Sequence, residues 1–257
     1  MAKNLGGAII DLLESERVEL RAAAITVLAA VGKGDKSVEA ALTERLADGD
    51  AVVRRIALEA LADMGTSGIA PRLIPLLRGD DETLAERASQ LLAQHGAGAE
   101  AALRKEVGTG PVGARRVMAQ LLLRRGTQAA IEAVLDQLSD AEFGEQALQL
   151  LRAELDRARA DAGGDKIANL IEKSAVARTT DASKQLAKAW AAAHKAAEGY
   201  HASRAKAGGK AKRATRPGGS NGEPAPSDPL RDPEVAHGVA ALGSLLRLIG
   251  YLARPET

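Results

Sequence analysis

The sequence predicts an all-α protein built as an α-solenoid of stacked helix pairs. The first observation is a period, because a glycine closes a short apolar helical stretch at nearly equal intervals, at Gly32, Gly65, Gly96 and Gly126. The second is composition, since the apolar residues are mostly Ala and Leu, with one Phe, two Tyr and one Trp in 257 residues. Ala and Leu favour helices, and the aromatic residues that favour strands are scarce. A period of this length is typical of repeats that stack on their neighbours.

About five helix pairs are expected. The first helices should lie near residues 5–14, 37–47, 69–78, 97–107 and 128–138, and the second helices near 18–31, 51–64, 82–95, 112–125 and 142–158. In the second of these second helices, Val53, Ala57 and Leu61 recur at helical spacing and predict a buried face. Asp50 precedes them and should cap the helix by accepting hydrogen bonds from its first amides. Pro75 falls deeper in its helix, so we expect a kink or a late start there.

The period fails after Asp156, and the rest of the chain divides by composition. We expect a repeat domain over 1–160, a helical extension over 161–203, a flexible basic linker rich in Gly and Pro over 204–232, and an amphipathic helix within 233–257. The extension should hold a short helix near 165–176 and a longer one near 181–203. An apolar stripe on the longer helix should dock on the solenoid end: Leu186, Trp190, Ala193, Ala197 and Tyr200. The last helix is either the start of further repeats or a cap that packs back onto the solenoid.

The segment from Asp50 to Leu61 resembles the start of the second helix of HEAT repeats, in the short bacterial form that is similar to the repeats of phycobilin lyases. In that family an Asp before the helix and an Arg in its first turn form a ladder between neighbouring repeats. Asp50 and Arg54 match both members of the pair. Four other residues each match one member: Arg21, Arg115, Asp81 and Asp140. The resemblance covers roughly residues 5–157 and implies architecture far more than function.

Composition excludes several classes of function. The chain has no Cys, which excludes disulfides, thiol catalysis and Cys-bound zinc and fits a cytoplasmic location. We find no export signal and no uninterrupted apolar stretch of about 20 residues, so we expect no membrane span. The charge is asymmetric: residues 1–165 carry 20 basic and 26 acidic side chains, whereas residues 166–216 carry 12 and 3. Such an asymmetry can steer different partners to different segments.

Nothing in the sequence indicates catalysis, a cofactor or a metal. None of the four histidines, His95, His194, His201 and His237, lies in the His-Glu pair through which HEAT-repeat hydroxylases bind iron. Phosphate loops and nucleophile motifs do not occur. HEAT-like DNA glycosylases stack bases on several aromatic residues, and here the only Trp lies outside the repeats. We therefore expect a protein that is not an enzyme.

The expected function is a scaffold or adaptor that holds a protein partner on its concave surface. The second helix of each pair usually lines that surface in HEAT-like solenoids, so the candidate binding residues are polar ones on these helices: Arg54, Arg55, Arg87, Arg115 and Arg116. The same paired arginines would otherwise belong to repeat ladders and exposed faces. The identity of the partner is not encoded in any motif of the chain.

The alternative function is non-specific association with nucleic acid. Six cations lie between Glu198 and Glu223 with no acid among them: Arg204, Lys206, Lys210, Lys212, Arg213 and Arg216. Such a run could neutralise phosphates and release counterions. The competing interpretation is a solvated linker that binds nothing. Tyr200 is the only aromatic residue nearby, so stacking on single strands is not expected.

Overall fold

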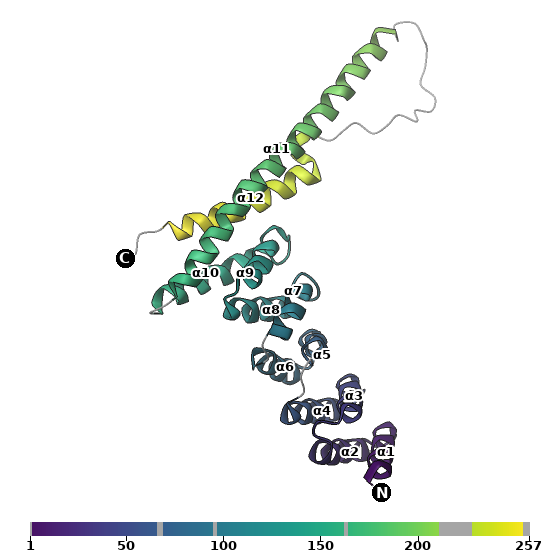
Figure 1. Cartoon of the computed structure of the whole chain (residues 1–257). Helices are drawn as coiled ribbons and strands as arrows, with labels where there is room; N and C mark the ends of the chain where they lie inside the picture. Colours follow the sequence, from purple (N-terminus) through teal and green to yellow (C-terminus); the bar gives the residue numbers. More distant parts are fainter. Residues whose placement is uncertain (1, 66–68, 95–96, 162–163, 211–227, 254–257) are drawn as a thin grey trace. The chain divides into compact units, whose positions relative to one another are not determined.

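The computed structural model describes residues 2–65, 69–94, 97–161, 164–210 and 228–253. Over these residues it contains helices and no strand, which confirms the all-α solenoid. The chain divides by its contacts into two compact units, Met1–Ala130 and Ile131–Thr257 (Figure 1). Each unit is described by itself below.

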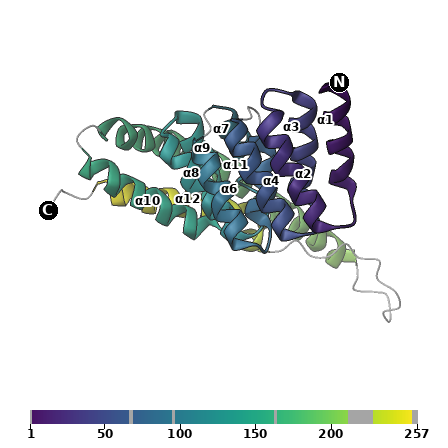
Figure 2. The ribbon, with the colours of Figure 1, turned by 90° about the horizontal axis from the view of Figure 1, so that it is seen from below.

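The first unit is a row of helix pairs. Its elements are α1 (Ala2–Asp11), η1 (Leu12–Glu14), α2 (Val18–Val31), α3 (Lys36–Glu44), η2 (Arg45–Ala47), α4 (Ala51–Met64), α5 (Ala70–Leu73), η3 (Ile74–Arg78), α6 (Glu82–Gln94), α7 (Ala97–Glu106) and α8 (Val112–Arg125), where η denotes a 3-10 helix. The second helices α2, α4, α6 and α8 follow one another on one side, and the first helices lie on the other (Figures 1 and 2). Each second helix contacts the next one in the row. The expected second-helix ranges are therefore confirmed to within one residue in this unit.

The core of this unit comes from the repeating apolar positions. Leu28, Leu61, Leu92 and Leu122 occupy equivalent places on the four second helices, and each is at most 1% exposed. Small residues such as Ala57 beside them let neighbouring helices approach closely. Leu and Ala at these spacings therefore have two effects: they favour the helix, and they pack in the interface between neighbouring repeats.

The glycines that mark the period end their helices in different ways. Gly65 and Gly126 have φ of 67° and 64°, the left-handed conformation that favours glycine after a helix. Gly32 has φ of −100°, and a Cβ there would lie 2.7 Å from Val38, so close packing requires this glycine. Gly96 lies outside the described residues. At Pro75 the α-helix gives way to η3, as expected for a proline deep in a helix.

The second unit contains the last repeat pair and the C-terminal helices. Its elements are η4 (Asp136–Ser139), α10 (Gly144–Ala160), α11 (Asp165–Lys210), η5 (Pro229–Arg231) and α12 (Pro233–Leu252), and α9 (Gln128–Leu135) spans the boundary between the units. The expectation of two helices in 165–203 is wrong, because α11 is one helix of 46 residues. Polar residues between the two expected helices bond inside α11, where the Thr179 and Ser183 hydroxyls donate to the carbonyls of Ala175 and Thr180.

Helix α12 packs back onto the last repeat pair, as the cap alternative requires. It contacts α11, α10 and η4. Polar contacts hold its end to α10: Arg247 Nη1 lies 2.7 Å from a carboxylate oxygen of Glu145, and the Tyr251 hydroxyl lies 2.6 Å from Asp156. Helix α12 thus lies in one compact unit with η4 and α10.

The composition of α12 corrects one expectation from the sequence. Among the described residues it is the single helix long and apolar enough to cross a membrane, and 22% of its apolar window is buried. No such stretch was expected from the sequence. The same composition suits a helix packed within a folded unit, and here Val235, Leu245 and Leu248 of α12 are buried.

The apolar stripe of α11 faces α12 and not the repeat helices. A Cβ built on Gly238 of α12 would lie 3.1 Å from the Leu186 side chain. Trp190 borders the same contact but stays 41% exposed. The expected docking of this stripe on the solenoid end is therefore wrong for Leu186 and Trp190, since the C-terminal helix supplies the contact.

Candidate partner-binding surface

Several arginines on the second helices form contacts between neighbouring repeats. Arg21 of α2 makes a bidentate pair with Asp48 before α4, with distances of 3.0 Å from Nε to Oδ2 and 2.9 Å from Nη2 to Oδ1. The two side chains are only 13% and 4% exposed. Burial by itself would raise the pKa of Asp48, but hydrogen bonds from Arg21 and the Asp50 amide, with the charges of Arg21 and Arg45, outweigh burial and lower that pKa. Asp48 is therefore ionised and locks the first two repeats together.

Arg54 continues this ladder to the next repeat. Its Nη1 donates to the carbonyl oxygen of Asp48 at 2.8 Å, and its Nη2 lies 3.8 Å from a carboxylate oxygen of Asp81 before α6. Asp50 has a different role, since its carboxylate accepts from the amide of Val52 at 2.8 Å and caps α4. Of the ladder residues that the resemblance implied, Arg54 and Asp81 pair with each other, while Arg21 pairs with Asp48.

Two more candidate residues are held within the repeats. Arg87 of α6 makes a bidentate pair with Glu59 of α4, at 2.8 and 2.7 Å. Arg115 of α8 is 4% exposed, and its Nε donates to the carbonyl oxygen of Val107. Arg54, Arg87 and Arg115 therefore contribute to the architecture, and their guanidinium groups are already engaged in the free protein.

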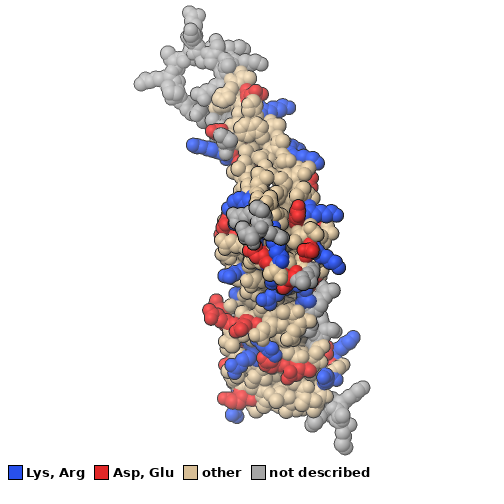
Figure 3. All heavy atoms as spheres, turned by 90° about the vertical axis from the view of Figure 1, so that its left-hand side faces the viewer, with Lys and Arg blue, Asp and Glu red and all other residues tan. Residues whose placement is uncertain are grey.

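Arg55 and Arg116 differ from these three because they are exposed. Within the described residues neither side chain makes a hydrogen bond or an ion pair. The repeat spacing places Glu86 at the equivalent position of α6, and it is exposed as well. The three side chains form a charge row on α4, α6 and α8 that reads basic, acidic, basic. Figure 3, seen from the side of the second helices, shows basic and acidic side chains intermixed.

A shallow depression accompanies the first member of this row. It has a volume of about 80 Å³ and is lined by Ala51, Val52 and Arg55 of α4 and by Asp81, Thr83 and Leu84 at the start of α6. Val52 is 45% exposed, which makes it an apolar contact point beside a free cation. Val52 and Glu86 were not among the residues expected from the sequence, although an alignment of the repeats by their glycines places both on the outer face of the second helices.

The basic segment of the alternative function is only partly described. Arg204, Lys206 and Lys210 lie on the last turns of α11, so the expected linker over 204–232 is helical up to residue 210. Lys212, Arg213 and Arg216 lie outside the described residues. Ala205, Lys206 and Ala207 are good helix formers and favour continuation of the helix past residue 203, whereas Gly208 and Gly209 are not.

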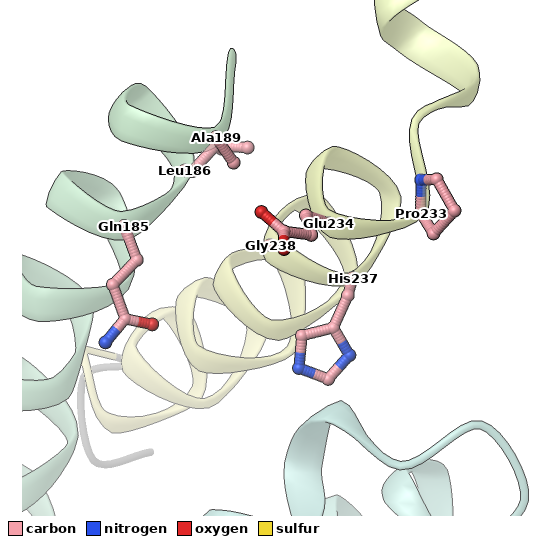
Figure 4. A pocket seen from close by; sticks show the side chains of 7 residues that line it. All are labelled: Gln185, Leu186, Ala189, Pro233, Glu234, His237 and Gly238. Atoms are coloured by element: carbon pink, nitrogen blue, oxygen red, sulfur yellow. The ribbon is translucent and has the colours of Figure 1, made fainter. Parts of the chain in front are cut away.

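Two depressions larger than the one beside Arg55 lie between α11 and α12 in the second unit. One has a volume of about 360 Å³ and is lined by residues of both helices, among them Gln185, Glu234 and His237 (Figure 4). The other, of about 320 Å³, is lined by apolar residues around Trp190 and Val239. In the part of the chain that the structure describes, no group of three or more His, Asp or Glu side chains could hold a metal ion.

Comparison with known proteins agrees with this architecture. A family model of HEAT repeats matches residues 8–93, which span the helix pairs from α1 to α6. No curated protein matches the chain at a significant level. HEAT repeats are commonly scaffolds for protein interactions, and the family is typically not catalytic. With its stacked helix pairs and its ladder of Arg and Asp, this part of the chain is similar to HEAT repeats.

Proposed function

We propose that the chain is a non-enzymatic cytoplasmic scaffold that binds a protein partner along the second-helix side of its repeats. The binding surface is the charge row of Arg55, Glu86 and Arg116 together with Val52. HEAT repeats commonly act in this way, and the position of the row on successive second helices gives an extended partner several points of contact.

One observation carries the proposal. Arg54, Arg87 and Arg115 are engaged inside the repeats, whereas Arg55 and Arg116 lie beside them, exposed and without a hydrogen bond or an ion pair in the described structure. The two exposed guanidinium groups therefore contribute little to folding and keep their donors for a carboxylate.

The charge row also limits what can bind. A complementary segment presents carboxylates to Arg55 and Arg116 and a basic group to Glu86 between them. An apolar side chain of the partner would fit beside Val52, where the depression is shallow. A uniformly acidic partner would place one carboxylate against Glu86, and this unfavourable contact makes an alternating segment the better match.

The test compares charge reversals on the two sides of the row of repeats. The variant carries Arg55→Glu and Arg116→Glu, and the control carries Arg72→Glu, an exposed arginine on the first helix α5. Immobilised proteins are exposed to a lysate of the source cells, and the retained proteins are quantified by mass spectrometry. We expect proteins retained by the wild type and by R72E to be lost from the double variant. All three should melt within about 2 °C of one another by circular dichroism, since exposed substitutions change stability little.

Three results would overturn this assignment. Retention of the same proteins by the double variant would show that Arg55 and Arg116 are not part of the partner-binding surface. An equal loss of retained proteins with R72E would show that retention depends on the total charge of the protein and not on these two positions. If the double variant instead unfolds at a much lower temperature, these arginines are structural, and the premise that they are free is wrong.

A second candidate function is non-specific binding of nucleic acid by residues 204–216. It is favoured by the run of six cations uninterrupted by an acid. Binding of duplex DNA should then weaken steeply with salt, with a log–log slope of up to about −5 for six phosphate contacts. Replacement of the six cations by Gln should abolish binding and leave the repeats folded. Absence of any gel retardation at about 50 mM salt would exclude this function.

A further inference from the structure

Helix α2 carries an exposed apolar stripe. Leu20, Val27 and Val31 are 37%, 44% and 70% exposed, which is unusual for three large apolar side chains on one short helix. Their spacings of seven and four residues place them on one face of the helix. Ala23 and Ala30 are exposed along the flank of the same stripe. The stripe is therefore a continuous apolar ridge with small residues beside it.

The equivalent positions are buried in the other repeats. When the repeats are aligned by their closing glycines, the stripe maps onto Val53, Ala60 and Met64 of α4, which are 0%, 6% and 6% exposed. In the next repeat the same alignment maps Leu20 and Val27 onto Leu84 and Leu91 of α6, both 4% exposed. These positions are the ones by which a second helix packs on its predecessor in the row.

On α2 this packing face has no predecessor among the described residues. Figures 1 and 2 show α2 at the end of the row of second helices, with α4 on its other side. End repeats of stable solenoids usually present a polar outer face, because an apolar one invites association. The sequence of α2 instead keeps the apolar pattern of an internal repeat.

We propose that this end face binds a second copy of the chain, with α2 packing antiparallel on α2 of its partner about a two-fold axis. An antiparallel arrangement centred between Ile25 and Thr26 brings Leu20 of one copy opposite Val31 of the other, so the ridge matches itself. The two small alanines beside it allow the helices to approach closely. Self-complementarity of one patch is what an isologous dimer requires.

Charge favours the same arrangement. The exposed charges near the start of α2, Glu16, Arg17 and Glu19, sum to −1, and those just beyond its end, Lys33, Asp35 and Lys36, sum to +1. Antiparallel packing sets the acidic end of each helix against the basic end of its partner, whereas parallel packing sets like charges together. The two helix dipoles are also antiparallel in this arrangement, and their interaction is favourable.

A head-to-tail dimer, in which α2 of one copy packs on the last repeat pair of another, is not favoured. In the second unit the last repeat pair is covered, because α12 packs on α10 and η4. Contacts such as Arg247 to Glu145 and Tyr251 to Asp156 would have to break before another repeat could pack there. We therefore take the same face of α2 on a second copy of the chain as the complementary surface.

Sedimentation velocity of the full chain tests the dimer between about 1 and 100 µM, a range that covers weak association. We expect the wild type to sediment increasingly as a dimer. A variant with Val27→Glu and Val31→Glu should dissociate at least about 100-fold more readily, since it loses apolar contacts and gains four like charges in the interface. The control is Val52→Glu, because Val52 is 45% exposed, as Val27 is at 44%, but lies on α4 away from the end face. It should dimerise like the wild type.

Cross-linking supplies an independent readout, because the chain contains no Cys. A Val27→Cys variant treated with a short bis-maleimide should form a covalent dimer, and Val52→Cys should not. A wild type that stays monomeric across the whole concentration range would overturn the proposal. So would equal dissociation by V52E, or cross-linking at residue 52 as efficient as at residue 27. A dimer that survives V27E and V31E would place the interface elsewhere and overturn it as well.

Discussion

Removal of the buried charge at Asp48 should weaken the contact between the first two repeats. In Asp48→Asn the side chain keeps its shape but loses the negative charge that faces Arg21. Arg21 and Arg45 are only 13% and 16% exposed, so water cannot readily replace the lost carboxylate. An uncompensated cation close to the interior is costly, and breaking a buried ion pair typically costs about 3–5 kcal/mol.

For D48N we expect a loss of stability somewhat smaller than this range. Asp48 accepts two hydrogen bonds from Arg21, and bonds to a charged group contribute about 1.5–3 kcal/mol each. The Asn oxygen can keep one of them in a weaker, neutral form. Arg21 Nη1 also retains its bond to the carbonyl oxygen of Ser15 at 2.8 Å. We therefore expect the free energy of unfolding to fall by about 2–3 kcal/mol.

Urea unfolding followed by far-UV circular dichroism measures this loss, and Asp50→Asn is the matched control. Asp50 lies two residues away and caps α4, and Asn caps a helix as well as Asp does. D50N should therefore change stability by less than about 0.5 kcal/mol. A double-mutant cycle of Asp48→Asn with Arg21→Met isolates the pair, and we expect a coupling free energy of about 1.5 kcal/mol or more.

The pH dependence of the same measurement follows from the lowered pKa of Asp48. A carboxyl whose pKa is lower in the folded state stabilises the fold above its unfolded value of about 3.9, and this contribution is lost as pH falls through the folded value. The stability difference between the wild type and D48N should be largest at neutral pH and shrink below about pH 4. A loss under about 1 kcal/mol at neutral pH, a coupling near zero, or a difference that grows in acid would refute the reasoning.

Three further outcomes are expected in the same assay. Leu61→Asp buries a charge at a position that is 1% exposed, so it should cost at least about 3–5 kcal/mol and unfold the neighbouring pairs; a stable L61D would contradict the core assignment. Gly65→Ala should cost about 1–2 kcal/mol through its φ of 67° alone, because a Cβ there meets no atom within 4 Å; an unchanged urea midpoint would contradict this. Tyr251→Phe removes the bond to Asp156 and should cost about 1 kcal/mol, measured as a lower urea midpoint, and no change would mean that this bond does not hold α12.

The sequence by itself determined the class of fold and most helix boundaries of the repeats. Val53, Ala57 and Leu61 recur at helical spacing, and Asp50 stands where a cap is needed, so the limits of α4 follow from local chemistry. The left-handed glycine Gly65 ends the same helix. Such features are readable because each one depends on residues within a few positions of one another.

Only the tertiary structure decided the roles of the charged residues. Arg54 and Arg55 are neighbours of the same type, yet Arg54 reaches Asp48 and Asp81 while the Arg55 side chain is exposed. The difference arises because successive residues of a helix project about 100° apart, and a charged partner such as Asp81 belongs to the next repeat, far along the chain. The apolar ridge on α2 illustrates the same limit. Its sequence pattern matches that of an internal helix, and its exposure follows from what packs against it, which is a property of the stack and not of the helix.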